Sequence, residues 1–338
     1  MNVVGDVAAA SAAPRRRVTL VTHRDALDPR TGGWGLQQAF GRRFDLATVI
    51  VEDGWPCTAS DLGDLDGTEA VVFFVRFAQL RSRRPLDWGS YAGLRLIYEQ
   101  DALLNFRPGN PFEGAWSGVV TSHGFDVLLC TGKQVAAELA TRDVRTYWLP
   151  KGYDAHTFRD LGAERFGYCY YGSPYPARRA MLEHLRRERL VVGILGTRGA
   201  ELNGELNRFL GCLICNMESQ QRLPGSAGRW LATAFPSFAI RMYPAFEPMI
   251  KNFEVAGAGC APVADEIPEL ADLGFVDGDT MIGYPNFAEL VEKMREYERR
   301  PDDLRAIGAR AAALAASRHT WDHRVAQLDA DLDHFPRR

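Results

Sequence analysis

The sequence of 338 residues lacks several features that would point to a class of protein at once. No apolar run approaches the ~20 residues of a membrane-spanning helix, so we expect no transmembrane segment. The 40 basic and 43 acidic residues give a net charge of −3, and no excess of one sign favours nucleic acid or an anionic membrane. No internal repeat of ~20–50 residues is present, and no low-complexity segment lies beyond the N-terminal leader.

Cysteine is also sparse, and its placement speaks against a metal site. The six cysteines lie mostly within apolar runs, which is typical of buried, reduced thiols in a cytoplasmic protein. Cys212 and Cys215 form a CxxC pair, but no second cysteine pair or nearby histidine completes a zinc site. The sequence therefore predicts no bound metal and a cytoplasmic location.

The first residues are rich in alanine, and their arginines follow the small residues. A secretory signal places its basic residues before an apolar core. We therefore expect a flexible leader at 1–16.

What the sequence does contain is a regular alternation of short apolar runs and helical patterns. Hydrophobic residues make up 46% of the chain, and its length fits two domains of roughly 100–200 residues each. The alternation predicts an α/β fold with parallel sheets. We expect strands at 18–22, 46–51, 70–77, 94–98, 127–130 and 146–149, then at 168–171, 190–195, 209–216, 238–242 and 260–264.

A domain boundary is predicted near Pro150, where a Pro-Lys-Gly-Tyr-Asp stretch separates the two series of strands. We expect a first Rossmann-like, doubly wound domain at 17–155 and a second at 156–318. A C-terminal helix at 319–338 is expected to cross back to the first domain. Two such domains place a ligand cleft between the carboxyl ends of their sheets.

The first half offers three candidate site residues. Gly33 lies in a Thr-Gly-Gly-Trp-Gly stretch that we expect to form a loop after the first strand, where glycine lets a phosphate or sugar approach. This stretch is not GxGxxG, so a nicotinamide cofactor is disfavoured. Asp101 follows the strand at 94–98 and could serve as a general base or cap a turn. His123 could carry a proton on the acceptor side or be structural. His319 and His323 are expected to pack or cap.

The second half contains a glycine turn followed by a helix. Gly172 and Ser173 come directly after the strand at 168–171, and a turn with a helix N-terminus behind it can hold a phosphate. Arg178 would add charge-assisted hydrogen bonds to that phosphate, or would lie on the surface of an amphipathic helix.

The most informative segment is the helix expected after Pro248. Lys251 and Glu254 are three residues apart and hence neighbours on one helix face, and Glu247 could share this face two turns earlier. The rest of the helix is almost entirely apolar, and a charged pair in a buried helix calls for a partner such as a ligand. A cation near a helix N-terminus suits a diphosphate, and a carboxylate suits a sugar diol. The pattern favours a nucleotide-sugar site, with Asn252 among its donor-binding residues.

Together, five segments resemble the donor half of the GT-B-fold glycosyltransferases. The resemblance is closest to the group of CgeB-type spore maturation proteins and their relatives in glycosyltransferase families 1 and 4, and it covers roughly 94–330. The segments that carry it are 125–133, 148–158, 171–178, 251–263 and 319–325.

The resemblance implies a glycosyltransferase with a nucleoside-diphosphate-sugar donor, foremost a UDP-sugar, bound mainly by the second domain. It implies that Glu254 holds the ribose hydroxyls, that Lys251 and Arg178 neutralise the diphosphate, and that Asp101 lies on the acceptor side. The acceptor would be a hydroxyl of a natural product or surface glycan in a bacterium, bound by the first domain. Transfer would retain the anomeric configuration without a metal or other cofactor, because a helix dipole and cations replace the metal.

The sequence also departs from the family in three places. Many relatives have two glutamates separated by seven residues, whereas six residues separate Glu247 from Glu254. Glu247 is a candidate catalytic residue beside Asp101 and His123, and this spacing makes it the least secure of the set. Lys151 replaces the usual asparagine of the linker. The segment 218–234 matches no family motif and could be specific to the acceptor. A nucleotide-sugar epimerase and a non-catalytic homologue of the same fold remain the alternatives.

Overall fold

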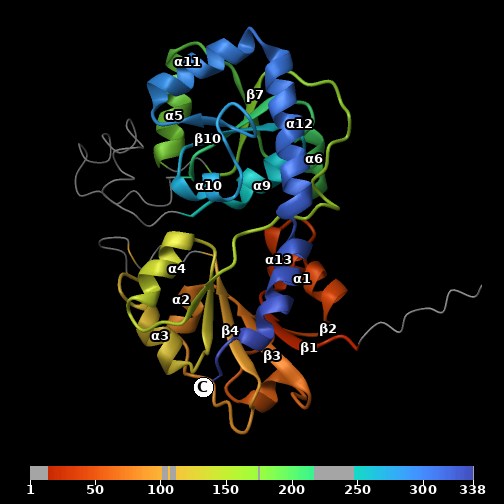
Figure 1. Ribbon diagram of the computed structural model, residues 1–338, viewed down its shortest axis with the longest axis vertical. Helices are drawn as coiled ribbons and strands as arrows, with labels where there is room; N and C mark the ends of the chain where they lie inside the picture. Colours follow the sequence, from red (N-terminus) through yellow and green to blue (C-terminus); the bar gives the residue numbers. More distant parts are fainter. Residues whose placement is uncertain (1–13, 101–105, 107–111, 174–175, 217–246, 338) are drawn as a thin grey trace, which may run out of the picture.

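The computed structural model describes residues 14–100, 106, 112–173, 176–216 and 247–337. Most of the predicted leader, Asp101, the segment 218–234 and the predicted strand at 238–242 lie outside these residues. Within the described part, no helix is long and apolar enough to cross a membrane. The chain forms two α/β domains, one above the other in Figure 1.

The N-terminal domain is built on a parallel sheet with the strand order β2-β1-β3-β4-β5-β6. Its strands are short, nearly continuous apolar runs because helices cover both faces of the sheet. They are β1 Arg17–Thr22, β2 Asp45–Ile50, β3 Thr68–Phe74, β4 Leu94–Glu99, β5 Val127–Cys130 and β6 Thr146–Trp148. Helices α1 (Gly32–Arg43) and α13 (Trp321–Asp331) pack on one face. The other face is covered by α2 (Phe77–Arg81), α3 (Trp116–Ser122) and α4 (Lys133–Ala140).

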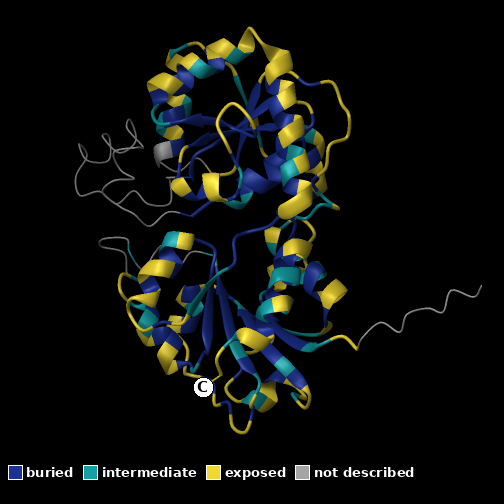
Figure 2. Ribbon diagram, in the orientation of Figure 1, coloured by how far each residue is buried: buried dark blue, intermediate teal, exposed yellow. Residues whose placement is uncertain are grey.

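The C-terminal domain has a second parallel sheet, with the order β11-β10-β9-β7-β8. Its strands are β7 Tyr168–Tyr171, β8 Val192–Leu195, β9 Gly211–Ile214, β10 Ala261–Asp265 and β11 Ile282–Tyr284. One face carries α5 (Pro176–Arg187) and α11 (Phe287–Glu298), and the other carries α6 (Gly199–Leu206), α9 (Ile250–Gly257) and α12 (Pro301–Arg318). The short α10 (Pro268–Asp272) faces the first domain. Figure 2 shows the inner strands of both sheets as the buried centre of each domain, whereas the edge strands β2, β6 and β8 are only partly buried.

The chain crosses between the domains twice, and the two crossings are hydrogen-bonded to each other. Tyr153 N donates to His319 O at 3.1 Å on the way out, and Trp321 N donates to Tyr153 O at 2.9 Å on the way back. Gly152 is needed here because a Cβ would stand 2.9 Å from Trp321 N. The returning chain forms α13, which packs along α1, so the predicted C-terminal crossing helix is confirmed.

The two histidines of this crossing pack and cap, as expected. His319 Nε2 lies 2.8 Å from the carbonyl oxygen of Leu273. His323 N donates to Thr320 Oγ1, the N-cap of α13.

Each strand predicted within the described residues is present, with ends displaced by up to three residues. Other expectations were wrong or incomplete. The stretch 31–35 is not a loop, because α1 already begins at Gly32. The helices α2, α3, α6 and α10 and the three-residue strand β11 were not predicted.

Candidate functional site

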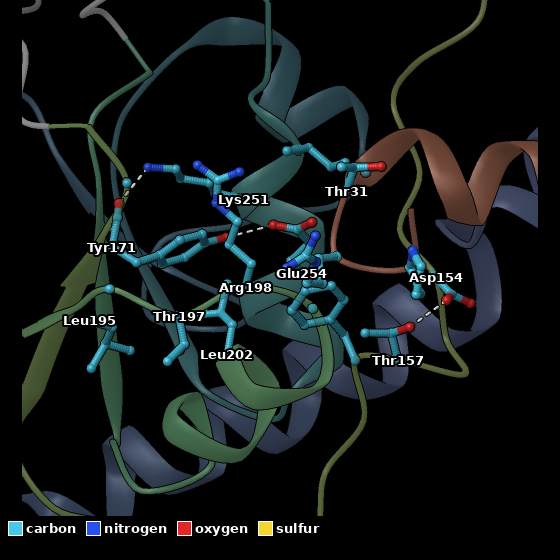
Figure 3. A pocket seen from close by; sticks show the side chains of 18 of the residues that line it. Thr31, Asp154, Thr157, Tyr171, Leu195, Thr197, Arg198, Leu202, Lys251 and Glu254 are labelled. Atoms are coloured by element: carbon cyan, nitrogen blue, oxygen red, sulfur yellow. Dashed lines mark hydrogen bonds between the residues drawn. The ribbon is translucent and has the colours of Figure 1, made fainter. Parts of the chain in front are cut away.

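A cavity of about 400 Å³ lies where the two domains meet, at the carboxyl ends of β7 and β8. Figure 3 shows its side chains. The N-terminal domain contributes the loop that precedes α1, and the C-terminal domain contributes most of the rest. The lining residues are Pro29, Arg30, Thr31, Gly32, Asp154, Thr157, Phe158, Tyr171, Gly172, Ser173, Leu195, Gly196, Thr197, Arg198, Gly199, Leu202, Ile250, Lys251, Glu254 and Trp321.

Three helices begin at this cavity. Thr31 is the N-cap of α1, Arg198 that of α6 and Met249 that of α9, and none of the three is capped by its own side chain. The first-turn N–H groups of a helix carry partial positive charge and can donate hydrogen bonds to a bound anion. The cavity therefore favours a negatively charged ligand.

The two domains approach each other here through glycine. Gly199 has φ +58, and a Cβ there would lie 3.0 Å from Arg30 Cα of the first domain. A Cβ at Gly32 would lie 2.8 Å from Ile250 Cδ1 of the second. A larger side chain at Gly199 would press on the backbone of the first domain, whereas one at Gly32 would displace the end of the Ile250 side chain.

Lys251 places a positive charge inside the cavity wall. Its Nζ donates to the carbonyl oxygen of Tyr171 at 2.5 Å and lies 4.6 Å from the centroid of the Tyr171 ring. Gly172 has φ +92, and a Cβ at this position would overlap Lys251 Nζ. The absence of a side chain at Gly172 therefore leaves room for the ammonium group. This is the turn at which the sequence predicts a phosphate.

Glu254 lies one helical turn after Lys251 and is nearly buried. Its Oε2 accepts a hydrogen bond of 2.8 Å from the Tyr171 hydroxyl, drawn in Figure 3. Burial raises the pKa of the carboxyl above 4.5, whereas the Tyr171 hydroxyl and the charge of Lys251 act to lower it. A cation and a carboxylate therefore line the same cavity, as predicted from their spacing in the sequence.

Not all predicted donor residues reach the cavity. Gly172 and Ser173 line it. Arg178 lies behind the turn, where it donates to Ser173 O and contacts Met249 Sδ at 3.2 Å. Asn252 is fully buried and donates to Asn216 Oδ1 at 2.7 Å, so it supports the start of α9 from within.

Glu247 lies outside helix α9, and the expectation that it shares the face of Glu254 was wrong. Helix α9 starts only at Ile250, so Glu247 lies three residues before the helix and does not follow its periodicity. Its carboxylate accepts from Thr131 Oγ1 at 2.7 Å and from Lys151 Nζ at 2.9 Å. Glu247 therefore joins the C-terminal domain to the end of β5 and to the linker.

The remaining candidates of the first domain lie apart from the cavity or outside the described residues. Gly33 sits in the first turn of α1 and packs against Ala26, next to the lining residue Gly32. His123 lies in the core, with Nε2 3.1 Å from Leu80 O and its ring stacked on Phe125. Burial lowers the pKa of His123. Asp101 is not among the residues that the structure describes.

Several lining residues were missed from the sequence. The loop Gly196-Thr197-Arg198-Gly199 follows β8 as the Gly172 turn follows β7, so a glycine-bearing turn after a strand was the available signal. Asp154 accepts from Thr157 Oγ1 at 2.5 Å at the rim of the cavity. Trp321 comes from the returning chain, and no local pattern connects it with this site.

Neither a metal centre nor a disulfide is seen in the described part of the chain. No group of three or more His, Cys, Asp and Glu side chains is placed there to hold a metal ion. All six cysteines are free thiols, and only Cys57 is exposed.

Comparison with known proteins adds to this picture. Residues 178–330 match a family described as "Glycosyl transferase-like". No curated protein matches the chain. Among solved structures, the chain is similar to sucrose-phosphate synthase from Thermosynechococcus elongatus, with a TM-score of 0.57, 10% identity and coverage of 94% of this chain and 99% of that one.

The fold is GT-B. A trehalose-6-phosphate synthase has a TM-score of 0.53 and 10% identity, and the match covers 95% of this chain and 100% of that one. TarM has a TM-score of 0.54 and 9% identity, but the match covers 78% of this chain and 55% of TarM. At these identities the structural likeness concerns the fold. Together, the GT-B architecture and the family match over 178–330 support a transferase enzyme.

Proposed function

We propose that the protein is a glycosyltransferase that moves a sugar from a nucleoside diphosphate to a hydroxyl group of an acceptor. The observation that carries this proposal is the pairing of Lys251 with Glu254 on one cavity wall, between the two GT-B domains. The match of the second domain to the "Glycosyl transferase-like" family supports it.

The donor would lie across the start of α9. Lys251 and the N–H groups of the helix N-termini would neutralise the diphosphate, and Glu254 would accept hydrogen bonds from the ribose hydroxyls. Gly172 and Ser173 let the phosphates come close to the backbone. Arg178 and Asn252 would contribute from behind, by fixing the turn and the helix start. We infer a UDP-sugar as the donor.

Departure of the diphosphate is the step that these residues would accelerate. Negative charge grows on the leaving phosphate as the sugar–oxygen bond breaks, and Lys251 with the helix N-termini would stabilise that charge. Such preorganised positive charge can take the place of a metal ion. Closure of the two domains would exclude water and so favour transfer over hydrolysis.

The acceptor would enter from the first domain, for which we propose the bounds 17–155. The second domain, 156–318, would hold the donor, and 319–338 would tie the two together.

Asp101 remains our proposed acceptor-side base. His123 has no part in this proposal, because its ring is buried against Phe125 and bonded to Leu80 O. Glu247 would hold the domains together rather than contact the sugar. Retention of configuration and a cytoplasmic location complete the proposal.

A panel of UDP-, GDP- and TDP-sugars tests the proposed function. The thermal midpoint should rise with one of them, and nucleotide should be released slowly to water and faster with an acceptor. Isomerisation of the sugar without release would indicate an epimerase. Absence of both a shift and release with all three would indicate a non-catalytic homologue. Nuclear magnetic resonance of the product would report its anomeric configuration.

A further inference from the structure

One tyrosine contacts both Lys251 and Glu254 of the cavity wall, through three different groups. Tyr171 ends strand β7 and is 7% exposed. Its carbonyl oxygen accepts from Lys251 Nζ, its ring faces the same ammonium group, and its hydroxyl donates to Glu254 Oε2. The positions of Lys251 and Glu254 are therefore fixed by β7 as well as by their own helix.

The hydroxyl of Tyr171 donates a hydrogen bond to Oε2 of Glu254 and not to Oε1. No hydrogen bond from the described part of the chain reaches Glu254 Oε1, and the carboxylate lines the cavity. A phenol that donates to a carboxylate favours the ionised form of that carboxylate. It also restricts rotation of the carboxylate plane, so Oε1 is held in one direction.

We propose that Tyr171 is a positioning residue for donor binding, whose hydroxyl orients the Glu254 carboxylate so that Oε1 receives the ribose diol. This inference rests on the proposed function, because it takes the ligand to be a nucleoside diphosphate. Tyr171 acts through Glu254. A carboxylate that is already oriented loses less conformational entropy when the ligand binds.

If Tyr171 served only to fill space in the core, its ring would suffice and its hydroxyl would have no effect on binding. Tyr171→Phe keeps the ring and its contact with Lys251 and removes only the hydroxyl. Tyr168→Phe is a matched control, because Tyr168 lies on the same strand, is buried and donates its hydroxyl to Met294 O at 3.1 Å, away from the cavity. Glu254→Gln removes the charge that the hydroxyl supports.

The test is calorimetric titration with UDP, GDP and TDP from pH 5.5 to 8.5 for the wild type, the three single variants and the Tyr171→Phe/Glu254→Gln double variant. For the nucleotide that binds most tightly, Tyr171→Phe should weaken binding by about five- to tenfold at pH 7.5. The loss should grow as the pH falls, because Glu254 then protonates at a higher pH. In the Glu254→Gln background the same substitution should have little effect, and Tyr168→Phe should bind like the wild type.

Two results would overturn the inference in different ways. If Tyr171→Phe weakens binding equally at every pH and adds fully to Glu254→Gln, or has no effect, then the hydroxyl does not act through Glu254. If the wild type binds none of the three nucleotides, the proposed function itself is wrong, and the positioning role fails with it.

Discussion

At the scale of single residues, the proposed function depends on two charged side chains, Lys251 and Glu254, whose buried surroundings favour ligand binding. Lys251 and Glu254 lie in a helix that is buried on all sides, where a charge is costly unless it is paired. Tyr171 contacts both side chains, and both line the cavity. The sequence was sufficient to predict this pair, because charged residues in an otherwise apolar helix stand out.

Replacing Glu254 by alanine should weaken nucleotide binding with the fold intact. Loss of hydrogen bonds to a charged group costs about 1.5–3 kcal/mol, which corresponds to a rise in Kd of roughly ten- to a hundredfold. Titration calorimetry measures this change. Glu292→Ala, an exposed residue of α11, is the control and should leave Kd unchanged. An unchanged Kd in Glu254→Ala would rule out the ribose contact.

Gly172→Ala should impair binding beyond the cost of backbone strain. An L-residue at positive φ costs roughly 1–2 kcal/mol, and here the added Cβ would also displace the Lys251 ammonium from Tyr171 O. Gly278→Ala is the matched control, because its φ is +74 and nothing lies within 4 Å of its Cβ. Both variants should lose stability in thermal unfolding, Gly172→Ala the more of the two, but only Gly172→Ala should lose nucleotide affinity. Equal affinities would contradict the role of Gly172.

At the scale of helices and strands, all described strands except β11 were predictable, because buried parallel strands are uninterrupted apolar runs. Helix α1 was misplaced because its first residues, including Gly32 and Gly35, have poor helical propensity. Tertiary packing explains the glycine at position 35, since a Cβ there would lie 2.7 Å from both Asp154 Cβ and Trp321 Cδ1. Such contacts between distant segments leave no local trace in a sequence.

One helix of the first domain is capped by the second. Helix α4 has Gly132 as its N-cap, and the carboxylate of Glu269 in α10 accepts from Gln134 N at 2.9 Å and from Lys133 N. The pKa of Glu269 is raised from 4.5 to about 7, chiefly by burial. The helix N–H groups of Gln134 and Lys133 act to lower this pKa, and the nearby charges of Glu247 and Asp272 act to raise it. The Lys133–Asp272 ion pair, at 2.9 Å, flanks this contact.

This cap should make stability depend on pH. The folded state keeps a proton on Glu269 between pH 4.5 and about 7 that the unfolded chain releases, so this residue adds stability as the pH falls through that range. Glu269→Gln should flatten the dependence by up to about 1.4 kcal/mol per pH unit. Thermal unfolding at several pH values measures it, with the exposed Glu138→Gln of α4 as the control. An unaltered slope in Glu269→Gln would show that Glu269 does not titrate in this range.

At the scale of the whole molecule, the site exists only because two domains meet. The GT-B architecture was predictable from the order of strands and helices and from the motifs of the second domain. The loop 196–199 was not assigned to the site, because its contact with Arg30 depends on how the domains dock. Glu247 was assigned to the site from the sequence but lies elsewhere, because its partners Thr131 and Lys151 are distant in the sequence.

The Lys151–Glu247 ion pair should stabilise the docking of the two domains. Both side chains are at most 10% exposed, and removal of one partner from a buried pair costs about 3–5 kcal/mol. Lys151→Met should therefore lower the thermal midpoint and enlarge the radius of gyration in small-angle X-ray scattering. Adding Glu247→Gln should restore most of the loss, because no buried charge is then left alone. Losses that simply add in the double variant would mean that the pair does not act as a unit.

The most direct test of the central claim is a crystal structure with the tightest-binding nucleoside diphosphate. The account predicts the diphosphate near Lys251 Nζ and the start of α9, and both ribose hydroxyls within hydrogen-bond distance of Glu254. A nucleotide bound elsewhere, or one whose ribose lies away from Glu254 while the cavity between the domains stays vacant, would contradict it.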